Sequence, residues 1–471
     1  MGRYTTNQLS NSTYPPEQRR FVRKPSDFRL RRSPEQELEE EQGYVERPSP
    51  TPPVREKEEQ AQEIHQDALL FARGVLGEAI MQGASDVHFE PKDYSYLVRF
   101  RIDGVLHQYM ERSIEEYEEI LNAIKVLGDM DIAEHATPQD GHIELVQEEV
   151  KKSATEQEQE EMHSSQHGME LGNKQHYFDI RVSVFPSVNG EVVVMRILNR
   201  ENALITIDGL GMDMDSLGKL HEVLLTSYGM MLITGPTGSG KTTTLYSIMS
   251  ELRSDEKNII TLEDPIEFHL SWLRQCEIRE ERGFTYEAAM ASVLRQDPDV
   301  LMVGEIRDPQ TAEHAVRSAL VGRIVGSTIH ANTTISTIAR LIELGIPRSI
   351  LAHTLNCIIA QRLVRRVCDF CKQPYTPSQT HLKYFGLENV EEPFYKGKGC
   401  EKCKQTGFKG RTGIFSIMVF DDAIRNMMFE EKPLNEIQNY AIENGMKTLK
   451  ADAVSKILSG TTTIEEAVRV V

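Results

Sequence analysis

Long apolar runs are missing from this chain of 471 residues. Nowhere do about 18 apolar residues follow one another, the length that a membrane-spanning helix requires. The N-terminus is also too polar for a secretory signal peptide. We therefore expect a cytosolic protein that does not cross a membrane.

Positive charge is scarce as well, since 53 Lys and Arg stand against 72 Asp and Glu and the formal net charge is −19. A dedicated nucleic-acid binder needs clustered Lys and Arg to neutralise phosphates. The acidic balance argues against that class and predicts no direct nucleic-acid binding, although it leaves room for a local basic patch.

Hydrophobic residues make up only 39% of the chain, which predicts that part of it stays unpacked. Residues 1–60 hold 8 of the 20 prolines and almost no periodic apolar pattern. Basic residues dominate this stretch as far as Arg32, and acidic residues follow. We interpret it as a disordered polar arm, either a solvated tail or a docking arm for acidic lipid or for a partner.

Residues 61–205 carry the signals of an α+β domain. Apolar residues recur at helical spacing from Leu69 to Ile80, which predicts a helix. The stretch 97–106 alternates and turns at Asp103-Gly104, which indicates a β-hairpin.

A second strand pair is expected in the same domain at 178–184 and 191–197. Before it, about residues 147–176 form an acidic stretch, which we interpret as a flexible insertion on one strand connection. Its histidines are expected to belong to a solvated loop rather than to a metal site.

From residue 206 to residue 471 strands alternate with helices, which predicts a mostly parallel sheet covered by helices. The central strands are expected at 229–234, 258–262, 300–303 and 322–328. A small cysteine-bearing segment spans about 365–412, and two or three helices close the chain.

The most informative motif is a complete phosphate-binding loop between an apolar run and a helical pattern. It reads Gly235, Pro236, Thr237, Gly238, Ser239, Gly240, Lys241, Thr242, and Thr243 follows it. Glycines let backbone N–H groups turn toward phosphate oxygens at a helix N-terminus. Lys241 is expected at the β- and γ-phosphates and the Thr242 hydroxyl at Mg²⁺. The loop predicts binding of a nucleoside triphosphate.

Three polar clusters stand where strands of the expected sheet end, and ligand groups gather at such ends. Glu305 is the best candidate to polarise the attacking water, Glu263 and Asp264 are candidates to order water or metal, and His330 is a candidate sensor of the γ-phosphate. The alternatives are a Glu305–Arg307 ion pair and a packed, hydrogen-bonded His330.

Four of the six cysteines form two C-x-x-C pairs separated by 28 residues, namely Cys368, Cys371, Cys400 and Cys403. Two such pairs complete a closed tetrahedral shell around one Zn²⁺, which predicts a structural metal. The alternatives are a redox pair or unused thiols.

Taken together, these motifs resemble those of the ATPases that power type II secretion, type IV pilus assembly and competence pseudopili. The likeness runs from about residue 65 to residue 471. It is carried by the phosphate loop and by several short motifs: Ala-Ser-Asp-Val-His-Phe-Glu-Pro at 84–91, Pro-Gln-Asp-Gly at 138–141, Thr-Leu-Glu-Asp-Pro-Ile-Glu at 261–267, Leu-Arg-Gln-Asp-Pro-Asp at 294–299, Val-Gly-Glu-Ile-Arg-Asp at 303–308 and Ala-Gln-Arg-Leu at 360–363.

The resemblance implies a homo-hexameric ring in which ATP lies between an N-terminal, PAS-like α+β domain and a RecA-like ATPase domain. It makes Glu263 and Asp264 the aspartate box, ends the Walker B strand at Glu305 and places His330 in the histidine box. It also implies arginine fingers from the N-terminal domain, for which Arg99 and Arg101 are candidates because they share one face of an expected strand.

The resemblance implies as well a polytopic membrane platform protein as partner, indirect contact with pilins or pseudopilins, and a peripheral position at the inner face of the plasma membrane. Family members with a long N-terminal domain use it to bind an inner-membrane recruiter, and here only the polar arm occupies that place. This short form resembles the competence branch. The tetracysteine element is usual in assembly ATPases and usually missing from retraction motors. The histidine box reads Ser-Thr-Ile-His-Ala where Ser-Thr-Leu-His-Thr is usual, and Arg323 stands where histidine is common.

The leading hypothesis is therefore an ATPase that drives filament assembly. A retraction motor, a DNA-translocating ring and a nucleotide-gated scaffold with negligible turnover are the alternatives. The tetracysteine element argues against a retraction motor, and the acidic balance argues against a DNA-translocating ring. The intact Glu305 and His330 argue against a scaffold without turnover.

Overall fold

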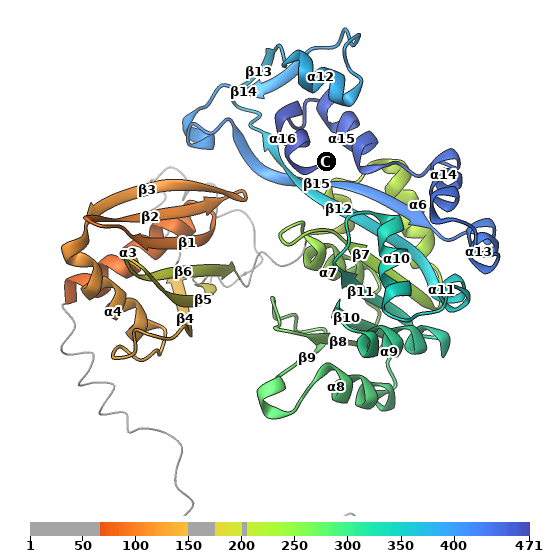
Figure 1. Cartoon of the computed structure of the whole chain (residues 1–471), viewed down its shortest axis with the longest axis horizontal. Coiled ribbons are helices and arrows are strands. Elements are labelled where there is room, and N and C mark those ends of the chain that lie inside the picture. The colour runs from red at the N-terminus through yellow and green to blue at the C-terminus, as the bar shows by residue number, and fades with distance from the viewer. Residues whose placement is uncertain (1–65, 149–174, 200–204) are drawn as a thin grey trace, which may run out of the picture. The chain divides into compact units, whose positions relative to one another are not determined.

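The computed structural model describes residues 66–148, 175–199 and 205–471. Two large β-sheets organise this part of the chain (Figure 1). The predicted arm over 1–60 and most of the predicted acidic insertion lie outside the described residues. No helix in the described ranges is long and apolar enough to cross a membrane.

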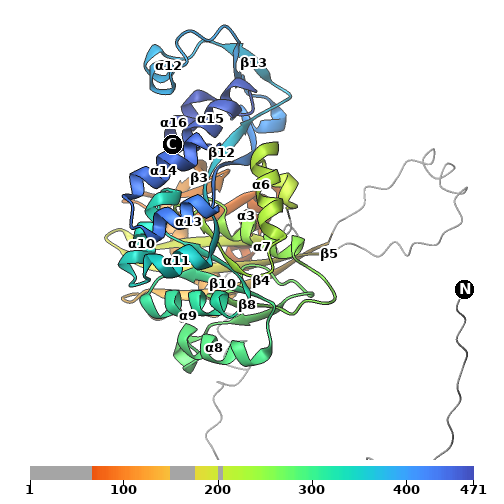
Figure 2. The same cartoon turned by 90° about the vertical axis from the view of Figure 1, so that its right-hand side faces the viewer.

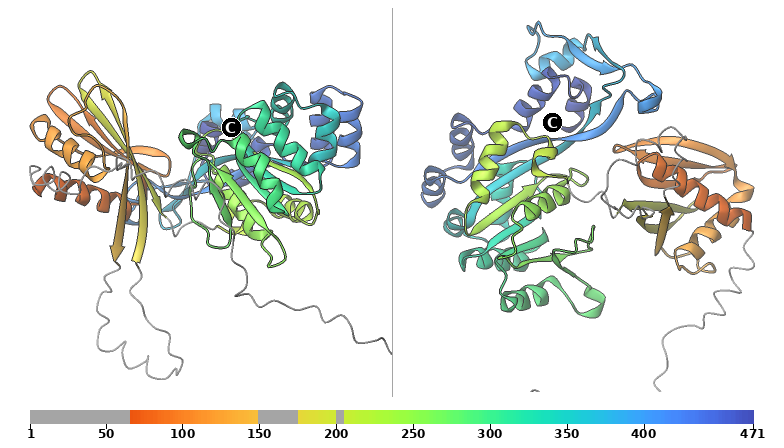
Figure 3. Two further views of the ribbon diagram at one scale, coloured as in Figure 1. Left: turned by 90° about the horizontal axis from the view of Figure 1, so that it is seen from below. Right: turned by 180° about the vertical axis from the view of Figure 1, so that it is seen from behind.

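The first sheet has six strands in the order β3-β2-β1-β6-β5-β4, and all neighbouring strands are antiparallel. Helices α3 and α4 pack on one face of it (Figure 3), and their apolar side chains share one core with the inward side chains of the strands. The bounds are α3 Gln66–Met81, β1 Ala84–Pro91, β2 Ser95–Ile102, β3 Val105–Ser113, α4 Tyr117–Leu127, β4 Gln139–Glu148, β5 Gln175–Ser187 and β6 Gly190–Asn199.

The predicted helix and hairpin are confirmed. The turn between β2 and β3 has positive φ at both central residues, 49° at Asp103 and 84° at Gly104, as a two-residue hairpin loop requires. The outermost residues of the stretch expected as an insertion, 147–148 and 175–176, belong to the β4–β5 ladder.

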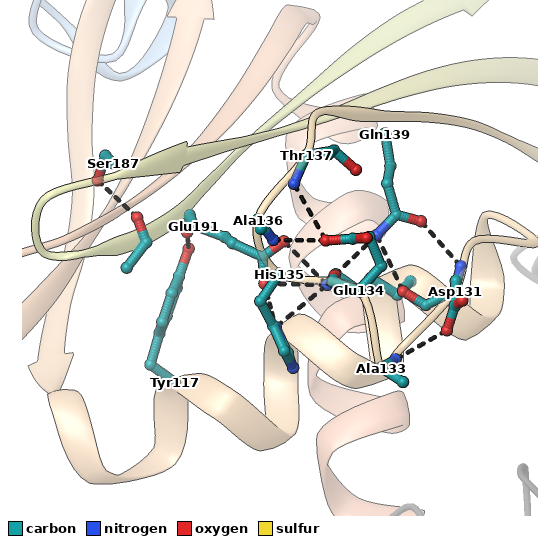
Figure 4. Close-up of polar contacts among 12 residues, drawn as sticks. Tyr117, Asp131, Ala133, Glu134, His135, Ala136, Thr137, Gln139, Ser187 and Glu191 are labelled. Atoms are coloured by element: carbon teal, nitrogen blue, oxygen red, sulfur yellow. Dashed lines mark hydrogen bonds and ion pairs between the residues drawn. The ribbon is translucent and has the colours of Figure 1, made fainter.

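A compact loop joins α4 to β4 and explains the Pro-Gln-Asp-Gly motif at its end (Figure 4). The Gln139 side chain closes the loop by bonding the backbone of Asp131 and the carbonyl of Glu134. Lys125, fully buried, donates to Glu134 O at 2.6 Å and to the Glu191 carboxylate at 2.9 Å. Buried charges are tolerated only when they are paired in this way, so the pair fastens the loop to β6.

The second sheet has seven strands in the order β15-β12-β7-β11-β10-β8-β9. Only β12 and β15 run antiparallel; the other neighbours are parallel. The strands are β7 Gly229–Thr234, β8 Ile259–Glu263, β9 Arg274–Glu277, β10 Val300–Ile306, β11 Ile324–Ile329, β12 Leu355–Val367 and β15 Phe408–Val419.

Helices cover both faces of this sheet (Figure 1, Figure 2). The core on one face includes residues of α6 and α7, and the core on the other includes residues of α8 to α11, α13 and α14. The helices are α6 Met214–Leu224, α7 Lys241–Glu251, α8 Tyr286–Val293, α9 Pro309–Leu320, α10 Thr334–Glu343, α11 Arg348–Thr354, α13 Asp422–Phe429 and α14 Leu434–Glu443. The predicted α/β class is thus confirmed.

A smaller unit extends from the end of β12 and the start of β15 and contains the four cysteines of the two C-x-x-C pairs. It comprises β13 Lys372–Tyr375, α12 Gln379–Phe385 and β14 Phe394–Gly397, and it packs with α15 Leu449–Leu458 and α16 Ile464–Val470 around a separate small core. The sequence analysis missed β12 and β15 as strands of the main sheet.

Candidate functional site

The phosphate-binding loop connects the carboxyl end of β7 to the first residue of α7. Positive φ angles of 156°, 76° and 85° at Gly235, Gly238 and Gly240 explain why glycine stands there. A Cβ added at Gly235 would lie 2.5 Å from the carbonyl oxygen of Gln361, and one at Gly240 would lie 2.9 Å from the Gln361 amide nitrogen. Strand β12 therefore supports the loop directly.

Several features of the loop fit a bound phosphate. Helix α7 begins without a side-chain cap, so its first N–H groups are free for an anion. Ser239 Oγ is buried and has no hydrogen-bond partner among the described residues. Lys241 Nζ donates to Gly235 O at 3.0 Å and to Pro236 O at 3.3 Å. Burial lowers the pKa of Lys241, and the charge of Glu305 opposes that shift.

Thr237, Thr242 and Thr243 line the same hollow as the clusters at the strand ends, together with Glu263, Asp264, Glu305, Arg307 and His330. Strands β11, β10 and β8 are neighbours in the sheet, so their carboxyl ends bring these side chains together beside the loop. The structure thus gathers the residues that the sequence analysis selected in this half of the chain.

Glu305 points toward the hollow because β10 is irregular there. The β10–β11 register shifts between Val303 and Ile306, and the Thr328 hydroxyl holds the shifted segment by donating to Gly304 O at 2.8 Å. Such a bulge re-aims a side chain at a strand end.

Both oxygens of the Glu305 carboxylate are engaged. Oε1 lies 2.9 Å from His330 Nε2, and Oε2 lies 3.0 Å from Arg307 Nε. The Glu305–Arg307 pair, which the sequence analysis left open as an alternative, is therefore present. Each carboxylate oxygen carries two lone pairs, so Glu305 can accept a hydrogen bond from a water molecule while both contacts are kept.

Arg307 was not selected as a site residue, although it stands two positions after Glu305. Its Nη1 lies 3.7 Å from the Asp264 carboxylate. Burial opposes the protonated form, but the hydrogen bond to Glu305 and the charges of Glu305 and Asp264 raise the pKa of Arg307. Arg307 therefore adds positive charge to the site besides that of Lys241.

The paired residues of the aspartate box differ sharply in exposure. The Asp264 side chain is 38% exposed, whereas Glu263 is 2% exposed. The Glu263 carboxylate accepts hydrogen bonds from Tyr246, Thr261 and Gln275. Of the two carboxylates that line the hollow, Asp264 is therefore the exposed one, and Arg307 is its partner.

His330 follows directly after β11, and its side chain is 50% exposed. The segment after it is fixed by Thr234, whose hydroxyl donates to Ala331 O at 2.9 Å and accepts from Ala331 N at 3.0 Å. His330 is therefore not a packed core histidine, and its contact with Glu305 ties the ends of β10 and β11.

Arg99 and Arg101 lie on the face of the first sheet opposite α3 and α4. Arg99 pairs with Glu90 at 2.5 Å, and Arg101 Nε lies 3.5 Å from Asp86.

Arg181 and Arg196 are cross-strand partners, and Arg196 and Arg101 both pair with Asp86 in the ladder. Three arginines and one aspartate thus form a row across four strands. The sequence analysis missed Arg181 and Arg196, because cross-strand register shows only in the folded sheet.

The four cysteines converge as the spacing predicts. All four sulfur atoms lie within 4.8 Å of one another, and the measured Sγ–Sγ distances are 3.9 Å for Cys368–Cys400, 3.8 Å for Cys371–Cys403 and 3.6 Å for Cys400–Cys403. Zinc bound tetrahedrally at about 2.3 Å needs sulfur atoms roughly 3.8 Å apart, far more than the roughly 2 Å of a disulfide.

The hydrogen bonds to one cysteine of the cluster, Cys403, also fit a bound cation. Burial opposes ionisation of Cys403, but the N–H groups of Cys400 and Gly407 donate to its sulfur and lower its pKa. Backbone donors that favour a thiolate are what a metal-binding cysteine requires. The four residues fit structural zinc.

The chain is similar to known proteins along most of its length. A family model described as "Type II/IV secretion system protein" matches residues 61–155 and 149–469. The type II secretion system protein E of Pseudomonas aeruginosa is 38% identical over 410 residues, which are 87% of this chain and 76% of that protein.

The type IV pilus assembly ATPase PilB of Thermus thermophilus is 38% identical over 399 residues, which are 84% of this chain and 42% of that protein. Among solved structures, the ATPase DotB of Legionella pneumophila superposes with a TM-score of 0.59 at 18% identity and covers 85% of this chain and 95% of its own. At that identity the likeness concerns the fold alone.

Proposed function

Because this chain belongs to the family of type II/IV secretion system proteins, whose model matches most of its length, we propose that it is a P-loop ATPase that powers assembly of a type IV pilus, a type II secretion pseudopilus or a competence pseudopilus. The reaction is hydrolysis of ATP to ADP and phosphate. The observation that carries the proposal is the meeting of the phosphate loop with Glu305, Asp264 and His330 at adjacent strand ends.

In this proposal each side chain has one task. Lys241 and the N–H groups at the start of α7 hold the β- and γ-phosphates, and Thr242 supplies a hydroxyl to Mg²⁺, which neutralises charge on the phosphates. Glu305 orients the attacking water through a carboxylate lone pair that Arg307 and His330 leave unused. His330, bonded to Glu305, reports whether the γ-phosphate is present.

The arginine row on the first sheet suits a second task. The row holds three arginines and one aspartate, and that aspartate pairs with Arg101 and Arg196 but not with Arg181, so the row carries excess positive charge. We assign Arg99 and the row, in a homo-hexamer, to the developing negative charge of the transition state. The cysteine unit holds structural zinc and keeps the ends of β12 and β15 in place.

The motor would act on a polytopic membrane platform protein from the cytoplasmic side and reach pilins or pseudopilins only indirectly. The tetracysteine cluster favours assembly over retraction. One observation favours a second candidate, a nucleotide-gated scaffold: nitrogen atoms of Arg307 and His330 lie 3.0 Å and 2.9 Å from the two Glu305 oxygens, and these contacts compete with water for the carboxylate.

The test measures ATP hydrolysis and oligomeric mass on the same samples across a range of protein concentrations. We expect turnover to rise with the hexamer fraction and Lys241→Ala to abolish both nucleotide binding and turnover. Binding without turnover in wild-type hexamers would favour the scaffold. Wild-type-like turnover by Lys241→Ala would remove the phosphate loop from its assigned role.

A further inference from the structure

The buried Glu263 carboxylate joins three elements around the proposed nucleotide site. Its hydrogen-bond donors are Tyr246 from α7, Thr261 from β8 at 2.5 Å, and Gln275 from β9 at 3.1 Å. All three donors are neutral. The Glu263 carboxylate is only 2% exposed, so water cannot replace a donor that moves away, and losing one costs free energy. The carboxylate therefore holds its three donors in place.

Tyr246 connects this carboxylate to the phosphate-binding helix. It is fully buried, and its ring meets the Phe268 ring edge-on with centroids 5.9 Å apart. It stands four residues after Thr242, so the two share one face of α7. Burial, together with the charge of Glu263, strongly raises the pKa of Tyr246, which keeps its hydroxyl a donor at every working pH.

Gln275 continues the connection on the other side of Glu263. Its amide nitrogen donates to Glu263 and, at 2.8 Å, to Phe268 O, while its oxygen accepts from Leu270 N at 2.7 Å. The segment that follows Asp264 is therefore attached to the same carboxylate as α7. Movement of α7 and movement of this segment are mechanically linked.

We propose that Tyr246 and Gln275 are positioning residues of the nucleotide site. By holding Glu263 inward they make Asp264, the next residue, the carboxylate that faces the hollow, and they transmit nucleotide binding at α7 to residues 264–275. The inference rests on the proposed ATPase function and assigns Glu263 a positioning role within it.

Hydrogen exchange with and without Mg²⁺ and ADP tests the linkage independently of turnover. In the wild type we expect ADP to protect amides in 264–275 as well as in the phosphate loop. Tyr246→Phe keeps the ring and loses only the donor, so it should bind ADP within about threefold of the wild type while losing the protection in 264–275. Tyr117→Phe is the matched control. It removes another buried hydroxyl, one that donates to Glu191 O at 2.5 Å in the first sheet, and it should change neither.

Steady-state kinetics give the second readout. Tyr246→Phe should lower kcat about tenfold with KM for ATP nearly unchanged, because ground-state contacts remain. Gln275→Met, which keeps the side-chain length but removes the amide, should act in the same direction. The double variant should lose no more than the stronger single variant, since both act through Glu263.

The outcomes separate the linkage from the enzyme itself. Normal ADP binding with no protection of 264–275 in the wild type, or full protection in Tyr246→Phe, would overturn the linkage and leave the ATPase proposal standing. Strictly additive losses in kcat would overturn it too. Failure of the wild type to bind ADP would overturn the proposed function, and the linkage with it.

Discussion

Replacing Glu305 by glutamine separates the chemistry of the site from its stability. The substitution keeps the size of the side chain and removes its charge. The oxygen of the new amide can accept a hydrogen bond from Arg307 or from His330, but its NH₂ group then faces the other nitrogen. The partners are 60% and 50% exposed, so water replaces the lost contact at little cost.

The two effects differ in magnitude. Ion pairs with partners this exposed are worth about 0.2 to 1 kcal/mol each, so the loss in unfolding free energy should stay below about 2 kcal/mol. Loss of a general base or water-orienting group lowers turnover about 10² to 10⁴-fold, which is about 3 to 5 kcal/mol in activation free energy. Glu305→Gln should therefore bind ATP normally, melt close to the wild type and turn over at most about 1% as fast.

The assay is single-turnover and steady-state ATP hydrolysis, with binding of a fluorescent ATP analogue and the melting temperature recorded on the same samples. Glu313→Gln is the control, because Glu313 lies on α9, just after β10, and pairs with the exposed Arg317. Turnover of Glu305→Gln within threefold of the wild type would refute the assignment. An equal loss in both variants would trace the effect to surface charge.

Three further predictions concern stability. Lys125→Met removes the buried cation beside the Glu191 carboxylate in the first sheet and leaves His135 Nδ1, at 2.7 Å, as a remaining partner. The change should cost about 1 to 3 kcal/mol in a denaturant titration, and a cost under about 0.5 kcal/mol would contradict the buried pair. Cys371→Ser should reduce bound zinc from one per chain and lower the melting temperature, and full occupancy would show that the ligand set is wrong. Burial raises the pKa of Asp213, but hydrogen bonds from Lys447 and Ser216 outweigh burial and lower that pKa to about 2. The stability that ionised Asp213 contributes is therefore complete above about pH 4 and is lost as the pH falls toward 2. Asp213→Asn should flatten the dependence of melting temperature on pH in that window, and an unchanged slope would argue against the Asp213–Lys447 pair.

The strands that the sequence predicted are those with strong local signals. The runs at 229–234 and 300–303 are entirely buried in β7 and β10, and buried parallel strands read as continuous apolar runs. Strand β12 was not predicted from an apolar run, and the reason is physical. It follows α11 without a turn and carries charged residues toward its end, because that end leaves the main sheet for the cysteine unit.

The sequence predicted which residues form the candidate site, but it did not predict which of their side chains point into it. Three short motifs separated along the chain converge because β8, β10 and β11 are neighbours in the sheet, and that convergence follows from the parallel α/β pattern. Which side chain of a motif faces the nucleotide depends on local geometry. The bulge in β10 decides it for Glu305, and the hydrogen bonds of Tyr246 and Gln275 decide it for Glu263.

Local geometry also explains why the sequence alone did not decide the role of Arg99 and Arg101. Two residues apart on one strand, Arg99 and Arg101 share a face, and this much the sequence shows. Their charge is balanced by Glu90 and Asp86 on β1, so neither alone offers free positive charge. The excess arises only when Arg181 and Arg196 join the row across β5 and β6. The anion affinity that we propose for this face therefore depends on strand register, and substituting Arg196 should weaken it more than substituting Arg99, which pairs with Glu90 outside the row.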